Sequence, residues 1–250
     1  MIFTLYKRAW SVMKCCYWQL LGLTWLGVFL VSVATLLGGP VLGIGIAASI
    51  LLNEALLMIY LNCYRGEPVE CIQLFRYFSD WKTIKRILSG MGWQILWLVL
   101  WLLIPVAGLV FFVIRGYEYR LTPYILATEP DVAPTQAIQI SKERTSGYKG
   151  KMFGAEILLT CGFAVVGFIL GLIGGLFDSE VISLIVMILL CLVEGFVLPV
   201  FLNLLHSAFY EEIMNPTMNV SIQADKYCTQ CGAALAADVN FCPKCGTRTH

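Results

Sequence analysis

The residues best suited to chemistry are four cysteines near the end of this 250-residue chain. Cys228 and Cys231 form one Cys-x-x-Cys pair, and Cys242 and Cys245 form a second pair after ten intervening residues. Thiolates are preferred zinc ligands, and two such pairs can surround one ion as a tetrahedron. Because protein would fill all four positions, the predicted zinc ion is structural rather than catalytic.

The same cysteines are also compatible with disulfides or a redox pair. Disulfides persist in oxidising compartments, whereas the charge pattern described below places the tail in the cytoplasm. Residues 227–250 are too few to stabilise themselves by apolar burial, so the metal is expected to contribute most of their folding energy. No basic stripe accompanies the cysteines, and a nucleic-acid partner is therefore not expected.

Other catalytic patterns are missing from the sequence. His206 and His250 are the only two histidines, and the chain contains no Gly-x-Ser-x-Gly elbow, Walker loop or His-Glu-x-x-His helix. The sequence predicts no catalytic residue, and a non-enzymatic protein is favoured over an enzyme.

The remaining elements are long apolar runs. The chain is 59% hydrophobic and 13% charged, with a mean hydropathy of +0.79, whereas soluble domains are about a quarter charged. About 20 apolar residues cross a bilayer as a helix. The runs are 17–37, 41–64, 90–114, 152–177 and 181–210. They predict an all-α integral membrane bundle of about six helices in residues 1–213, followed by a linker (214–226) and a zinc-ribbon tail (227–250).

Basic residues predict the orientation of the bundle. Three Lys or Arg residues precede the first run, five lie in residues 65–89 and six lie in residues 115–151. The turn at 38–40 has no basic residue, and the turn at 178–180 carries only acids. Because Lys and Arg in short loops favour the cytoplasmic side, both termini are expected in the cytoplasm of a multi-pass cell-membrane protein. The first run exceeds a signal-peptide core, so it is expected to remain uncleaved.

The middle run allows two interpretations. If residues 93–128 cross the membrane once, the charge rule is violated. We favour a pair of helices that turn near Pro105–Gly108, where proline removes a backbone donor. The pair either crosses twice or re-enters the membrane from one side. Residues 133–145 are expected to form a short helix at the surface.

Five charged residues are predicted to lie within the membrane: Glu54, Arg115, Glu118, Arg120 and Glu194. Such groups need a partner or a polar cavity because a charge in hydrocarbon is costly. We expect Glu54 or Glu194 to face the bundle interior and to pair with Arg115 or Arg120. Glu118, three residues after Arg115, offers a local pair as well. A structural ion pair is favoured over a substrate or proton site.

A small-residue stripe runs through the fourth apolar run. Gly167, Gly171 and Gly175 recur every four residues, a spacing that lets another helix approach closely. The stripe is compatible with packing inside one chain and with a homo-oligomer.

Several stretches resemble a family of bacterial multi-pass proteins, domain-of-unknown-function family 975. They are LWLVLWLLIPV (96–106), YRLTPYILAT (119–128), AIQISKERTSGYKGKMF (137–153) and AFYEEI (208–213). The family usually has Pro-Gly where this chain has Pro105-Val106-Ala107-Gly108, which is a departure. The resemblance implies a helical membrane protein and carries no assigned activity. The tail is similar to zinc ribbons appended to bacterial membrane proteins, which implies an interaction or regulatory element.

Three functions are compatible with these features. The favoured one is a non-enzymatic membrane protein whose zinc ribbon acts as a scaffold, sensor or recruiting element for a cytoplasmic protein. The second is a small transporter or permease subunit that uses Glu54, Glu194 and Arg115. The third is a membrane enzyme acting on lipids.

Overall fold

The structure is a computed structural model that describes residues 1–37, 42–104, 107–176, 184, 187–188, 192, 195–215, 226–227 and 234–235. The regular elements of the described part are helices except for two short strands, as the apolar runs predict. Its helices are α1 (Ile2–Leu37), α2 (Leu42–Arg65), a 3-10 helix η2 (Cys71–Phe78), α3 (Trp81–Leu102), α4 (Ala107–Glu118), α5 (Thr122–Thr128), α6 (Pro134–Arg144), α7 (Lys149–Leu176) and α9 (Leu198–Met214). The strands are β1 (Lys226–Tyr227) and β2 (Ala234–Leu235).

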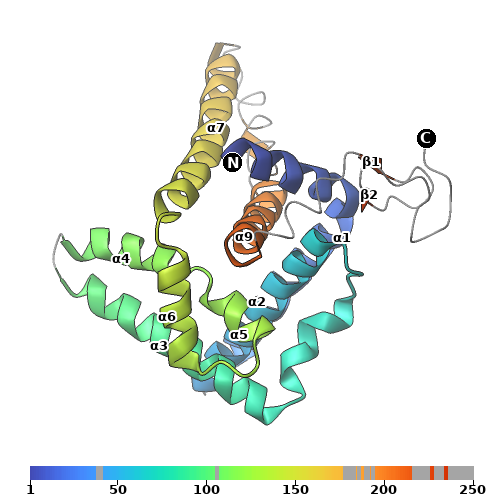
Figure 1. Ribbon diagram of the computed structural model, residues 1–250. Coiled ribbons are helices and arrows are strands. Elements are labelled where there is room, and N and C mark those ends of the chain that lie inside the picture. Colours follow the sequence, from blue (N-terminus) through green and yellow to red (C-terminus); the bar gives the residue numbers. More distant parts are fainter. Residues whose placement is uncertain are drawn as a thin grey trace.

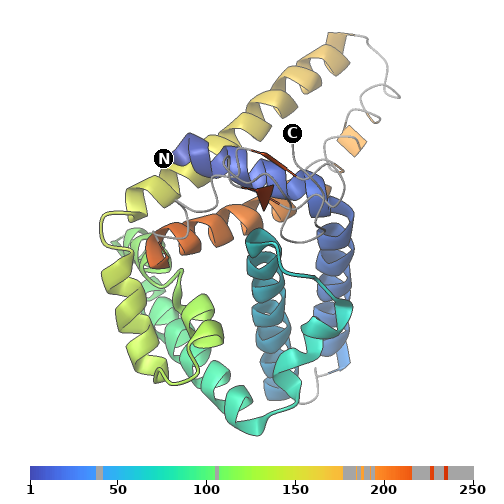
Figure 2. The ribbon, with the colours of Figure 1, turned by 45° about the vertical axis from the view of Figure 1, so that its right-hand side comes forward.

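Helices α1, α2 and α9 pack together although α9 follows α1 by more than 160 residues. Figure 2 shows the first part of α1 lying crosswise above α9 and its second part descending beside α2. Leu20, Tyr60 and Leu204 are fully buried where the three helices meet. The hydroxyls of Thr24 and Tyr60 are hydrogen-bonded at 2.5 Å and join α1 to α2 inside this core.

The short helix α5 lies at the centre of a second core, between α2, α3 and α6 (Figure 1). Its residues Thr122–Leu126 are all buried. Arg86 of α3 donates to the carbonyl oxygen of Leu126 and, at 2.7 Å, to that of Glu129. The guanidinium therefore supplies a partner for the Leu126 carbonyl group in the last turn of α5, where the helix itself leaves carbonyl groups without partners.

Helices α3 and α4 form a hairpin, which agrees with the predicted turn near Pro105–Gly108; residues 105 and 106 themselves lie outside the described part. A Cβ at Gly108 would lie 2.1 Å from the Trp101 carbonyl oxygen, so the turn requires glycine at this close approach. The rings of Trp101 and Phe111 face each other across the hairpin at 5.0 Å between centroids.

Large apolar side chains cover much of the outside of the described helices. Trp18 is 80% exposed on α1, Leu109 is 65% exposed on α4 and Phe168 is 68% exposed on α7. Monomeric soluble proteins rarely expose so much contiguous apolar surface. Three of the described helices are long and apolar enough to cross a membrane, namely α1, α2 and α7. These features fit a membrane location.

Helix α6 confirms the short helix predicted over 133–145 and lies between α5 and α7 in the chain. Its residue Ala137 is buried, whereas Lys142 and Arg144 in its last turn are exposed. Helix α9 continues to Met214, and its Glu211 forms an ion pair with Arg65 at 2.5 Å. This pair holds the end of α9 against the end of α2.

Candidate functional site

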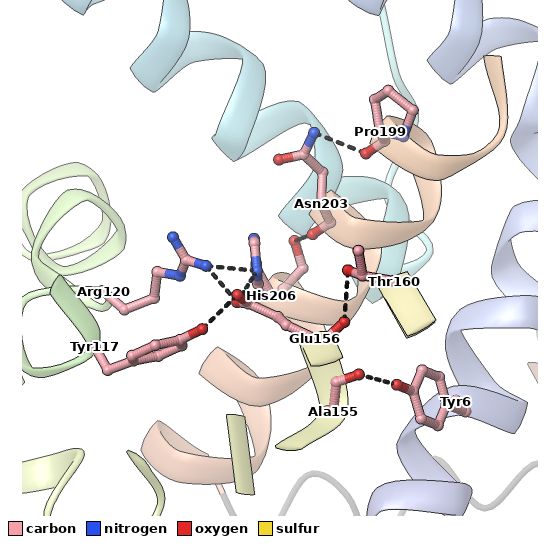
Figure 3. A network of polar contacts seen from close by, with 10 residues as sticks. Tyr6, Tyr117, Arg120, Ala155, Glu156, Thr160, Pro199, Asn203 and His206 are labelled. Atoms are coloured by element: carbon pink, nitrogen blue, oxygen red, sulfur yellow. Dashed lines mark hydrogen bonds and ion pairs between the residues drawn. The ribbon is translucent and has the colours of Figure 1, made fainter. Parts of the chain in front are cut away.

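A polar cluster joins three segments that are far apart in the sequence (Figure 3). Glu156 of α7 accepts a hydrogen bond at Oε2 from the Tyr117 hydroxyl of α4, at 2.6 Å. Oε1 of Glu156 forms an ion pair with Nη2 of Arg120, in the turn that follows α4. Nε2 of His206, on α9, lies 2.7 Å from the same oxygen. The carboxylate of Glu156 is therefore the centre on which α4, α7 and α9 converge.

The protonation of His206 determines which contact its Nε2 makes. This nitrogen lies 2.7 Å from Oε1 of Glu156 and 3.0 Å from Nη2 of Arg120. If Nε2 carries a proton it donates to Glu156, and if the proton is on Nδ1 the bare Nε2 accepts from Arg120. The cluster can therefore exchange one hydrogen bond for the other without a change of backbone.

Neighbouring hydrogen bonds fix the backbone around Glu156. The Tyr6 hydroxyl of α1 donates to the carbonyl oxygen of Ala155, and Thr160 donates to that of Glu156 at 2.8 Å. The Glu156 and His206 side chains are 19% and 14% exposed. Hydrogen bonds to a carboxylate with so little exposure are screened less than those of a surface group, whereas the Arg120 side chain of the ion pair is 36% exposed.

A second cluster is centred on Glu118, a predicted site residue. Its Oε2 pairs with Arg115, which confirms the local pair three residues apart, and its Oε1 lies 2.6 Å from Nζ of Lys149. The Ser141 hydroxyl donates to the Glu118 carbonyl oxygen at 2.7 Å and accepts from the Leu121 amide at 3.2 Å. These bonds tie the end of α4 to α6 and to the start of α7.

Glu54 lies in the interior of the bundle, where it is 1% exposed. Its Oε1 has no hydrogen-bond partner among the described residues. The structure does not show the expected pairing of Glu54 with Arg115 or Arg120, because these arginines pair with Glu118 and Glu156. Glu194, the other predicted partner, lies outside the described residues.

Sequence reasoning did not select Glu156 or His206 as site residues. The available signal was that Glu156 is the single charged residue of the run 152–177. An intramembrane carboxylate requires a partner, but nothing in the sequence indicates that this partner is Arg120, 36 residues away.

The four predicted zinc ligands lie outside the described residues. The strands β1 and β2 pair antiparallel, with Lys226 opposite Leu235 and Tyr227 opposite Ala234. Cys228 and Cys231 fall in the segment that connects the two strands. Among the described residues, no group of three or more His, Cys, Asp or Glu side chains could hold a metal ion.

Comparison with protein families identifies residues 227–249 as similar to the zinc-ribbon domain. A match to family 975 was not found, so the resemblance of the membrane part stays a prediction. Searches of the curated proteins and of the solved structures found no match. The chain thus combines helices long enough to cross a membrane with a zinc-ribbon tail.

Proposed function

We propose that this chain is a multi-pass membrane scaffold whose cytoplasmic zinc ribbon recruits a soluble protein partner. The observation that carries the proposal is the zinc-ribbon match at residues 227–249, joined to a body with membrane-length apolar helices. Ion pairs hold the helices of the membrane part together, and this part would anchor the tail at the membrane. The proposal involves no chemical step in the membrane.

The proposed topology places both termini in the cytoplasm. Helix α4 has 12 residues, which at 1.5 Å per residue span about 18 Å, whereas the hydrocarbon core is about 30 Å thick. This length favours a re-entrant α3–α4 hairpin over two complete crossings. Lys142 and Arg144 of α6 would then lie on the same side as the cations at the start of α1, as the charge rule requires.

The tail is proposed to fold around one zinc ion held by Cys228, Cys231, Cys242 and Cys245. The donor set fits because four thiolates complete a tetrahedron, and the β1–β2 pairing brings together the two ends of the segment that holds the first pair. When bound, zinc supplies most of the folding energy of this small unit. The folded ribbon would then present the partner-binding surface.

The test compares full-length protein with the Cys242→Ser/Cys245→Ser variant in native membranes. Cys71→Ser, which alters an exposed cysteine of η2, serves as the matched control. In the unaltered protein we expect about one zinc per chain by elemental analysis and a soluble protein captured by cross-linking. The double variant should lose both the zinc and this cross-linked protein. A partner that is captured equally by the double variant contradicts the recruiting role. Labelling of a cysteine introduced after His250 from outside intact cells contradicts the topology.

A second candidate function, a small transporter or permease subunit, is favoured by one observation. Glu54 is buried at mid-helix in α2 with a carboxyl oxygen that lacks a hydrogen-bond partner among the described residues. Such a group is available to bind a proton or a cation during transport. Transport would be supported if reconstituted vesicles take up a substrate or an ion and if Glu54→Gln abolishes this flux. The control variant Glu143→Gln, at an exposed position, should leave the flux unchanged.

We further infer that α7 mediates self-association. A Cβ added at Gly171 would meet no atom of the described residues within 4 Å, so this side of α7 has room for another helix. Closely spaced Gly167, Gly171 and Gly175 suit such a contact. The expected result is a purified dimer that Gly171→Leu converts to a monomer in light scattering, whereas Gly162→Leu leaves it intact.

A further inference from the structure

The first part of α1 presents an exposed face on which aromatic rings alternate with lysines. The face consists of Phe3, Lys7, Trp10, Lys14 and Trp18, spaced four, three, four and four residues apart. These intervals place all five side chains on one side of a helix. Phe3 is 79% exposed, Trp10 is 47% exposed and Trp18 is 80% exposed, and both lysines are exposed.

The opposite face of the same helix is fixed to the protein. Leu5, Ala9 and Met13 are buried, and the Tyr6 ring stacks on Phe201 of α9 at 5.7 Å between centroids. The Tyr6 hydroxyl also donates to the Ala155 carbonyl oxygen of α7. The orientation of the exposed face is therefore set by packing on both α7 and α9.

The N-terminal segment carries positive charge and no acidic residue of its own. The sequence contains no Asp or Glu before Glu54. Arg8 is directed away from the face, because its guanidinium lies over the Tyr64 ring at 4.7 Å. Lys14 remains on the face, where its Nζ lies 5.6 Å from the centroid of the Trp10 ring. Lys151 adds a further cation nearby, since its Nζ is 3.6 Å from Sδ of Met1.

We propose that this face binds the phosphate headgroups of anionic phospholipids in the surrounding leaflet. Lysine ammonium groups attract anionic headgroups, while Trp and Phe rings favour the boundary between headgroups and acyl chains. Figure 2 is consistent with this role, because the first part of α1 lies crosswise to the part that descends beside α2. The proposal goes beyond the function of the tail and does not depend on it.

The experiment titrates the full-length protein in neutral detergent with phosphatidylglycerol or phosphatidylcholine and counts bound lipids by native mass spectrometry. The test variant is Lys7→Gln/Lys14→Gln, and the matched control is Lys82→Gln/Lys142→Gln, which removes two exposed lysines elsewhere. A cation near an anionic surface contributes enough to change affinity about fivefold, so the double variant should reduce the preference for phosphatidylglycerol by up to about 25-fold. The control should retain the preference.

A second measurement locates the lipid. Photoactivatable phosphatidylglycerol is expected to cross-link to residues 1–18 in the unaltered protein and in the control, and much less in the test variant. An unchanged lipid preference in the test variant, or cross-links confined to other segments, would overturn the proposal. The proposal would also be overturned if the test variant were a monomer, the unaltered protein a dimer, and the lipid preference the same in both. In that case a second copy of the chain, rather than lipid, would cover this face.

Discussion

The ion-pair cluster centred on Glu156 gives the sharpest prediction for the stability of the bundle. In Glu156→Ala, Tyr117 loses the acceptor of its hydroxyl group, Arg120 loses its counter-ion and His206 loses one of its two Nε2 contacts. We therefore expect α4, α7 and α9 to be held together less strongly.

The magnitude follows from the exposure of the partners. A hydrogen bond to a charged group contributes about 1.5–3 kcal/mol. The Arg120 side chain is 36% exposed, so solvent screening limits its ion pair to about 1 kcal/mol. Because the contacts share one carboxylate they do not add fully, and we expect the free energy of unfolding to fall by about 3 kcal/mol. For a chain of this size that loss lowers Tm by about 6–12 °C.

The assay is thermal unfolding in detergent, followed by circular dichroism, for Glu156→Ala, Arg120→Gln and the double variant. The double-mutant cycle should give a coupling energy of about 1 kcal/mol between the two side chains. Glu143→Ala, which removes an exposed carboxylate on α6, is the control and should change stability by less than about 0.5 kcal/mol. If Glu156→Ala unfolds at the same temperature as this control, the cluster does not hold the helices together.

Two further predictions concern helix α3. Asp80 caps this helix, and hydrogen bonds from the Thr83 hydroxyl and then from backbone N–H groups of the first turn lower its pKa. The cap is therefore present above the ordinary carboxyl pKa and is lost as pH falls through the lowered value, so Asp80→Ala should speed amide exchange in this turn at neutral pH but not in strong acid. At Gly90, a Cβ would lie 2.6 Å from Cδ1 of the buried Leu126, so Gly90→Ala should destabilise the protein by about 1–3 kcal/mol. Gly92→Ala, where space is open, should instead raise Tm slightly, and equal effects of the two substitutions would contradict the tight contact between α3 and α5.

Local patterns predicted the features that depend on neighbours in the sequence. The break between α3 and α4 followed from proline and glycine near residue 105, and the Arg115–Glu118 pair followed from helical spacing. The short α6 was predicted within one residue of its ends. Each of these features is determined by backbone geometry within a few residues.

The central position of α5 and the partners of the buried acids could not be predicted in this way. Residues 122–126 include Thr122, Pro123 and Tyr124 and are nevertheless buried, whereas the more apolar residues 109–111 of α4 are exposed, so hydropathy does not distinguish a core helix from a lipid-facing one. Glu54 and Glu156 are both single acids in apolar runs, yet only Glu156 meets an arginine among the described residues. That difference depends on packing between segments more than 30 residues apart.

The contact between α1 and α9 has a consequence for biosynthesis. Phe201, which stacks on Tyr6, leaves the ribosome long after the N-terminal segment. Until then α1 can pack on α2 but lacks the surface that α9 adds, and Arg65 awaits its counter-ion Glu211. A nascent chain arrested before residue 198 would therefore expose an unfinished core, which would make it a substrate for chaperones and membrane proteases.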